Sequence, residues 1–236
     1  MSELVLALLY GSFAGAMIPA GAFLARIERL QPYWLEQELR HSIIAFGGGV
    51  LVSAVALVLV PHGLRHLSDE MAILAFVAGG GLFAVFDLLQ KRHGGDYSQM
   101  IAMFADFVPE ALALGALLAA GSDEAALLAF LIGIQNLPEA FNAWREVAAA
   151  GKISAQRAMV LFVCLAAIGP GMVLLGDIAL GTSPRITAAI MMVSAGGILF
   201  LMFQAIAVKA HLQNKQAPSL AAVAGFAVGI LAETLI

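Results

Sequence analysis

Charged side chains are scarce in this chain. Asp, Glu, Lys and Arg together make up 12% of the 236 residues, whereas apolar residues make up 61%. Soluble domains carry charges at roughly a quarter of their positions, so this chain has too little polar surface to cover a globule of its size. Lipid must face much of the molecule, which predicts an integral membrane protein.

Basic clusters and cysteine pairs are also missing. The formal net charge is −4 and no basic patch stands out, which argues against nucleic acid as a partner. The single cysteine, Cys164, lies in an apolar run, so neither a disulfide within the chain nor a cage of thiolate metal ligands is available. No basic residue precedes the first apolar run, and a cleaved signal peptide is therefore not expected.

Long apolar runs are abundant. A helix needs about 20 apolar residues to cross a hydrocarbon core of ~30 Å, and these runs lack the alternation of barrel strands. Because backbone groups must be paired within lipid, helices are expected. We predict an all-α fold in which residues 1–236 form a single transmembrane domain. Its eight spans are expected at about 4–25, 42–62, 71–90, 99–121, 124–144, 155–179, 186–210 and 218–236.

The distribution of Lys and Arg predicts the orientation, because cytoplasmic loops are enriched in these residues. With an external amino terminus, the external loops hold Arg65 and Arg185, and both chain ends are external. The internal loops then hold the ten other basic residues: Arg26, Arg29, Arg40, Lys91, Arg92, Arg145, Lys152, Arg157, Lys209 and Lys215. One missing or additional span would mix the two sides.

Two Pro-Glu motifs lie on neighbouring predicted spans. Residues 106–111 read Asp-Phe-Val-Pro-Glu-Ala, and residues 135–140 read Gln-Asn-Leu-Pro-Glu-Ala. Only residues 121–124 separate the two spans, so we expect an antiparallel hairpin whose inward faces are neighbours. Ionisable residues at membrane depth are costly and normally face a cavity or a partner. The motifs therefore mark the candidate functional site.

The residue types in these motifs suit a divalent cation. Positions i and i+4 share a helix face, which places Asp106 over Glu110 and Gln135 over Glu139. Each proline also frees a backbone carbonyl about one turn earlier. Carboxylate, amide and carbonyl oxygens are ligands for divalent cations, and three buried acidic groups need a counter-charge. We predict a metal site formed by Asp106, Glu110, Gln135 and Glu139, with Asn136 nearby.

A purely structural interpretation of each motif also exists. A proline-kinked transmembrane helix can carry one glutamic acid that is hydrogen-bonded to a neighbouring carbonyl and has no function. Two copies with the same proline spacing on adjoining spans favour a functional site over that interpretation.

At these residues the chain resembles the ZIP family of divalent metal transporters. The fourth and fifth of that family's eight helices carry motifs of the type His-Asn-x-Pro-Glu-Gly, which residues 135–139 match closely with Gln135 in the place of histidine. The resemblance covers the whole chain, including the eight spans and external termini. It implies transport of a divalent cation of the Zn, Mn, Fe or Cd class towards the cytoplasm, through a site between the fourth and fifth helices.

The chain also departs from the family pattern. Asp106 and Phe107 replace the first motif's His and Asn, Ala111 and Ala140 replace the glycines, and Gly169 stands where the sixth helix commonly has glutamate. Family members often hold two adjacent metals, and Phe107 and Gly169 affect mostly the second site. The resemblance thus implies one site here. Exchanging imidazole for carboxylate hardens that site, which weakens a preference for zinc over manganese.

Two other functions compete with transport. One is a relative with an altered or lost metal site that acts as a non-transporting regulatory or scaffold subunit. The other is an intramembrane hydrolase, which needs an open metal site with His ligands or a nucleophile at membrane depth. Neither feature is apparent, so an enzyme is not expected. His62, at the external end of span two, is a candidate for meeting an incoming ion, although such a histidine is more often structural.

The expected partners are the lipid bilayer and a divalent cation as substrate, with no separate cofactor. The composition suggests a multi-pass protein of a bacterial inner membrane. A homodimer is a further candidate assembly.

Overall fold

The computed structural model describes residues 3–27, 33–92, 97–181, 183–212 and 215–235. Every regular element in these ranges is a helix, which confirms the predicted all-α class. The elements before the hairpin of interest are α1 (Glu3–Ile27), α2 (Tyr33–Ala54), η2 (Val55–Leu59), α3 (Val60–His66) and α4 (Asp69–Arg92). The elements from the hairpin onwards are α5 (Ser98–Ala119), α6 (Glu124–Ala150), α7 (Ala155–Ala166), α8 (Ile168–Leu180), α9 (Pro184–Leu201), η3 (Met202–Ile206), α10 (Ala207–Ala210) and α11 (Ala217–Leu235).

Seven helical segments in the described residues are long and apolar enough to cross a membrane. They are Leu4–Ile27, Gln37–His66, Asp69–Arg92, Ser98–Ala119, Ala155–Leu180, Pro184–Ala210 and Ala217–Leu235. Each overlaps one of the predicted spans. The remaining predicted span, 124–144, lies in α6, which has 27 residues but carries Gln135, Asn136 and Glu139 in its middle. The count of eight spans and the external termini stay predictions.

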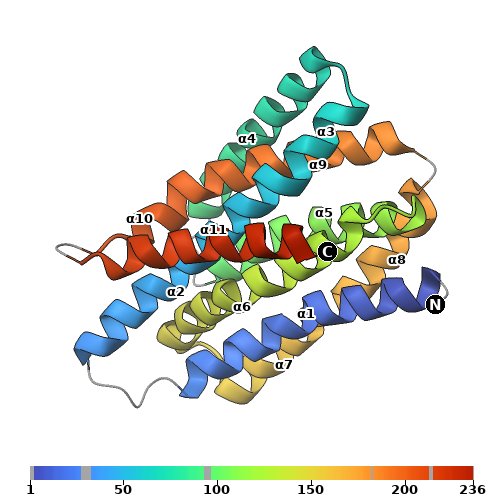
Figure 1. The fold of residues 1–236 in the computed structure, drawn as a ribbon. Helices are drawn as coiled ribbons and strands as arrows, with labels where there is room; N and C mark the ends of the chain where they lie inside the picture. Colours follow the sequence, from blue (N-terminus) through green and yellow to red (C-terminus); the bar gives the residue numbers. More distant parts are fainter. Residues whose placement is uncertain (1–2, 28–32, 93–96, 182, 213–214, 236) are drawn as a thin grey trace.

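The helices pack as two groups (Figure 1). In the first group α1 packs along α6 and α5 along α8, with α7 against α1. In the second group α2 packs along α11 and α4 along α9, with α3 against α9. The groups meet where α2 contacts α6 and where α5 contacts α9. The hairpin of α5 and α6 therefore belongs to one group and faces the other.

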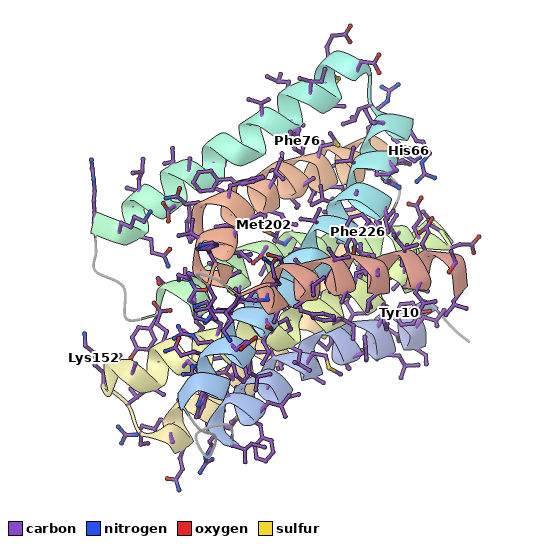
Figure 2. All side chains as sticks on the ribbon, turned by 60° about the vertical axis from the view of Figure 1, so that its left-hand side comes forward. Tyr10, His66, Phe76, Lys152, Met202 and Phe226 are labelled. Carbon is purple, nitrogen blue, oxygen red and sulfur yellow. The ribbon has the colours of Figure 1, made fainter. Side chains whose placement is uncertain are left out.

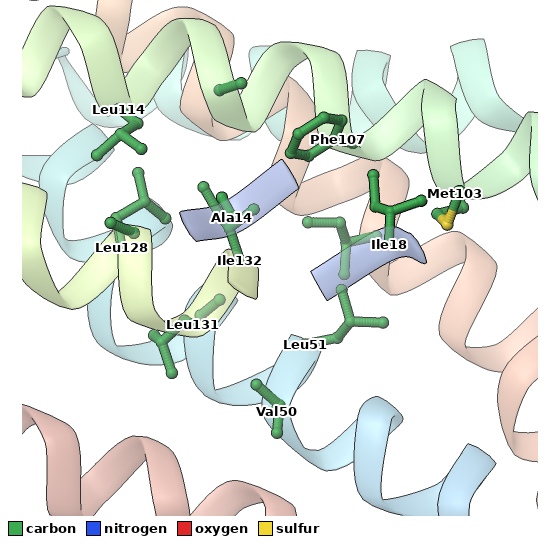
Figure 3. Close-up of a cluster of buried hydrophobic side chains, with 14 of the residues drawn as sticks. Ala14, Ile18, Val50, Leu51, Met103, Phe107, Leu114, Leu128, Leu131 and Ile132 are labelled. Atoms are coloured by element: carbon green, nitrogen blue, oxygen red, sulfur yellow. The ribbon is translucent and has the colours of Figure 1, made fainter. Parts of the chain in front are cut away.

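An apolar core surrounds the hairpin (Figure 3). Phe107 and Leu114 of α5 and Ile132 of α6 are almost fully buried, and so are Ile18 of α1 and Leu51 of α2. Most large exposed apolar side chains lie elsewhere, above all on α1, α4 and α11. Because a water-soluble protein would not expose such faces, lipid is the natural neighbour of these helices.

Close helix contacts hold α1 against the kinked part of α6. A Cβ atom at Gly21 of α1 would lie 2.1 Å from the backbone oxygen of Leu137, the residue that precedes Pro138. Asn136, in the same turn, donates a side-chain hydrogen bond of 2.9 Å to the backbone oxygen of Ala14 in α1. These two contacts hold α6 against α1 in the turn that leads into Pro138.

The predicted hairpin is confirmed by the turn between α5 and α6. Gly121 adopts a φ of 63°, a left-handed conformation that glycine tolerates best. The N–H groups of Gly121 and Ser122 donate to the backbone oxygens of Leu118 and Leu117. This arrangement ends α5 and reverses the chain within a few residues, as in common helix C-terminal caps.

Two predicted spans contain breaks next to a proline that the apolar pattern did not show, and a third, 186–210, contains the π-helical turn η3 (Met202–Ile206). The span 155–179 is divided into α7 and α8 at Ala167, three residues before Pro170. Proline has no N–H for the carbonyl one turn earlier, that of Ala166, and Gly15 of α1 packs against this carbonyl. The span 42–62 contains the π-helical turn η2 just before Pro61. Both interruptions lie next to a proline, as is usual for irregular turns.

Candidate functional site

The five predicted site residues lie on the facing sides of the hairpin. Asp106 and Glu110 belong to α5, and Gln135, Asn136 and Glu139 belong to α6. The first four are between 0% and 4% exposed. Glu139 is partly exposed as a residue, but both of its carboxylate oxygens are covered. All five polar groups are thus removed from solvent and lipid.

One direct hydrogen bond links the two motifs. Nε2 of Gln135 donates to Oε2 of Glu110 over 2.6 Å. This contact confirms that the inward faces of the two arms are neighbours. The sequence placed Gln135 on the inward face of α6 but did not indicate which residue of α5 it contacts.

Asp106 and Glu139 line a common cavity. The cavity has a volume of about 50 Å³ and lies between the two helix groups. Pro138 and Asn142 of α6 and Gln99 of α5 contribute to one side of it. The opposite side comes from α2 and from α9 and η3, through Ile44, Gly47, Gly48, Leu51, Leu201, Ala205 and Ile206. Glu110, Gln135 and Asn136 are not among the lining residues.

The three acidic groups are close enough to interact electrostatically. The carboxyl of Asp106 interacts with that of Glu110, and the carboxyl of Glu139 interacts with both. Like charges at close range in a low-dielectric interior repel strongly, because little water is present to screen them. A positive partner is therefore favoured at this point of the bundle.

Every predicted site residue has at least one buried oxygen without a hydrogen-bond partner in the described part of the chain. These atoms are Oδ1 of Asp106, Oε1 of Glu110, Oε1 of Gln135, Oδ1 of Asn136 and both carboxylate oxygens of Glu139. Buried polar atoms are nearly always hydrogen-bonded in folded proteins, since an unsatisfied group costs about 1–3 kcal/mol. These six oxygens are therefore available to a bound ion or to ordered water.

The described residues do not contain three or more His, Cys, Asp or Glu side chains already gathered as a metal-holding group. The predicted residues instead divide into a pair at the cavity, Asp106 and Glu139, and a hydrogen-bonded pair that does not line it, Glu110 and Gln135. Asn136 uses its amide N–H on α1. The predicted oxygen ligands are thus close to one another, but they do not all face a single point at which one ion could contact them.

An aromatic ring fills the space beside the first motif. Phe107 is 1% exposed, and its ring tip would lie 2.9 Å from a Cβ atom at Gly169 of α8. These are the two positions at which the family resemblance lacks oxygen ligands. The Phe107 ring lies in the space that a side chain at residue 169 would enter, so neither position supplies a polar group there.

Sequence reasoning missed Gln99 and Asn142. Nδ2 of Asn142 donates to Oε1 of Gln99 over 2.9 Å, and both residues line the cavity with Asp106 and Glu139. Asn142 is three residues beyond Glu139, so it occupies the same face of α6 one turn further on. That spacing was a usable signal. Gln99 gave a weaker signal, because it lies two helical turns before Asp106 on α5.

A second cavity adjoins the first. It has a volume of about 360 Å³ and lies between α4, α5, α9 and α10. Its polar lining includes Asp87, Gln90, Lys91, Gln204 and Lys209. Gln99, Ala102, Leu201 and Ala205 line both cavities. We call this second cavity the vestibule, because its lining extends from Lys91 to residues that it shares with the cavity of Asp106 and Glu139.

The opposite end of the hairpin is joined to the second helix group by an ionic cluster. Glu124, the first residue of α6, accepts from Arg65 and lies 2.9 Å from Nδ1 of His62. The ring of His62 stacks on that of His66, with centroids 4.3 Å apart. His62 is buried and paired in this structure, and its proposed meeting with an incoming ion stays a prediction.

Comparison of the chain with models of protein families gave no match, and comparison with curated proteins gave none either. The resemblance to the ZIP family rests on the two motifs and the expected topology.

Proposed function

We propose that this protein is a membrane carrier for a divalent metal cation, which it binds between α5 and α6 and moves towards the cytoplasm. The single observation that carries the proposal is the set of six buried, unpartnered oxygens on Asp106, Glu110, Gln135, Asn136 and Glu139. A divalent cation is the ligand that satisfies carboxylate and amide oxygens together and also offsets their negative charge.

One cation is expected for each chain. Asp106 and Glu139 would contact it from the cavity, and Glu110 would complete its shell after releasing Gln135. Phe107 and Gly169 leave no oxygen for a second ion beside the first. Oxygen ligands without histidine favour Mn²⁺ relative to Zn²⁺, compared with a site that contains imidazole.

Eight crossings with external termini fit the proposal best. The described parts of α1 and α11 begin and end at the same end of the bundle (Figure 1), as an even number of crossings requires. His66 and Lys152 lie towards opposite ends (Figure 2), in agreement with the predicted external and internal sides. α6 would be the additional crossing, since its 27 residues give a length of about 40 Å. Its polar centre is acceptable because other helices enclose it.

The position of the cavities supports release to the inside. The vestibule reaches the binding cavity from the Lys91 end, where the basic residues predict the cytoplasm. At the other end, Arg65, His62 and Glu124 hold α3 against α6. This arrangement fits a carrier whose vestibule faces the inside while the carboxylates themselves are covered.

The proposal is tested by titrating the purified protein calorimetrically with Mn²⁺, Zn²⁺, Cd²⁺ and Fe²⁺. We expect one bound ion per chain, and we expect Glu139→Ala to abolish binding. Glu233→Ala is the matched control, because this exposed glutamate lies near the end of α11. Uptake of the bound ion into proteoliposomes then tests transport. Failure of all four ions to bind would remove the basis of the proposal.

A non-transporting scaffold or regulatory subunit is the second candidate. The observation that favours it is the lack of a gathered acidic metal-holding group in the described residues. Calorimetry separates the two functions, because a scaffold with a lost site binds none of the four ions. A protein that binds an ion but shows no uptake would be a metal-responsive subunit.

A further inference from the structure

We infer that Gln99 and Asn142 form a second station for the cation, built from neutral amide oxygens, between the carboxylates and the vestibule. This inference rests on the proposed function. We call Gln99 and Asn142 the amide pair.

The amide pair lies where the two cavities meet. Four residues line both cavities, and Gln99 is the only polar one among them, the others being Ala102, Leu201 and Ala205. Asn142 lines the binding cavity and holds Oε1 of Gln99 by a hydrogen bond of 2.9 Å. Gln99 is therefore the polar side chain at the boundary between the cavity of Asp106 and Glu139 and the vestibule.

Glu146 fixes the position of Gln99. One carboxylate oxygen of Glu146 accepts from the backbone N–H of Gln99 over 2.6 Å, and the other accepts from Oγ of Ser98 over 2.5 Å. These bonds anchor the first turn of α5 to α6. Negative charge at a helix N-terminus is also favourable. Gln99 is therefore held in place by its backbone as well as by Asn142.

The chemistry of the amide pair suits transient binding. Amide oxygens are ligands for hard divalent cations, but affinity falls with the number of charged ligands. A neutral station binds the ion less tightly than Asp106 and Glu139 do. An ion in transit needs sites that replace part of its hydration shell and yet release it. The hydrogen bond between the two side chains would open as the oxygens turn towards the ion.

A purely structural role of the amide pair makes predictions that differ from those of a second station. If the amide pair only fastens α5 to α6, its loss lowers stability and leaves the rate of transport by each folded molecule unchanged. If it is a station, its loss slows transport without weakening binding at the carboxylates. A carboxylate in place of Asn142 then creates a tighter second site.

The test uses the full chain, with Mn²⁺ calorimetry and Mn²⁺ uptake into proteoliposomes. For Gln99→Leu and Asn142→Leu we expect an unchanged stoichiometry of one and a Kd within about threefold of wild type. We also expect uptake about tenfold slower, which corresponds to one lost ligand of ordinary strength. For Asn142→Asp we expect a second bound Mn²⁺ and slower uptake. Gln156→Leu is the control, because this exposed glutamine of α7 lines neither cavity.

Wild-type uptake by both leucine variants would overturn the inference and leave the proposed function intact. If those variants do not fold, the Asn142→Asp variant tests the inference instead. A stoichiometry of one Mn²⁺ per chain in that variant would overturn the second station. Absence of Mn²⁺ binding by the wild-type chain would instead overturn the proposed function, and the inference with it.

Discussion

Gln135 and Glu110 are joined by a 2.6 Å hydrogen bond between the two proline-containing helices of the hairpin. The bond leaves Oε1 of each residue buried and without a partner among the described residues. It therefore holds the arms together and leaves one oxygen of each residue for a ligand. Under the proposed function, this bond opens when Glu110 contacts the cation.

The contribution of this bond can be measured by a double-mutant cycle. Glu110→Leu and Gln135→Leu, made singly and together, should show a coupling free energy of unfolding of about 1–3 kcal/mol without metal, because each single variant leaves a buried polar group unsatisfied. Chemical unfolding in detergent gives the values. Additive effects would show that the bond does not link the arms.

Asp106→His should change the metal preference of the site. Imidazole favours Zn²⁺, whereas carboxylate is suited to Mn²⁺. The ratio of zinc affinity to manganese affinity should rise by about tenfold or more, which corresponds to at least 1.4 kcal/mol. Competition calorimetry measures the ratio. An unchanged ratio would show that residue 106 does not contact the ion.

Gly21→Ala should destabilise the protein and weaken metal binding. The added Cβ would lie 2.1 Å from the backbone oxygen of Leu137, so α1 and the kinked part of α6 would have to move apart. Overpacking of this kind costs about 1–3 kcal/mol. Gly81→Ala in α4 is the control, since nothing lies within 4 Å of a Cβ there. Equal thermal midpoints for the two variants would contradict the close contact.

Glu124→Ala should loosen the end of the bundle opposite the vestibule. It removes the carboxylate that both Arg65 and His62 contact, whereas Arg65→Ala removes one largely exposed partner. Surface ion pairs contribute little, so the arginine variant should have the smaller effect. Hydrogen exchange by α3 and by residues 121–126 should rise more in Glu124→Ala. The reverse order would indicate that Arg65 has a different role.

The helical fold could be predicted in large part because lipid imposes simple rules. Apolar runs of membrane-spanning length must be helices, and the structure confirms seven such segments. The fifth predicted span differs because Gln135, Asn136 and Glu139 make α6 less apolar. These are the residues of the candidate site. The features that suggested function also weakened the membrane signal of the helix that carries them.

The breaks within spans were less predictable. Pro61 and Pro170 were visible in the sequence, but a proline alone does not determine whether a helix bends, forms a π-helical turn or divides in two. That outcome depends on the neighbouring helix, as where Gly15 packs against the carbonyl of Ala166. The π-helical turn η3, over Met202–Ile206, has no proline in it and gave no sequence signal.

The candidate site, like the fold, could be predicted only in part from the sequence. The spacing of Asp106, Glu110, Gln135 and Glu139 correctly indicated that the two motifs face each other. It did not reveal that Asp106 and Glu139 share a cavity while Gln135 binds Glu110. Those pairings depend on the rotation of α5 relative to α6, which tertiary packing determines. Gln99 and Asn142 were missed for the same reason.

The most direct test of the central claim is anomalous diffraction from crystals of the protein loaded with Mn²⁺. The account predicts one anomalous peak in the cavity, within bonding distance of Asp106 and Glu139, and no such peak in Glu139→Ala crystals. A peak confined to another part of the molecule, or none in the wild-type protein, would contradict the account.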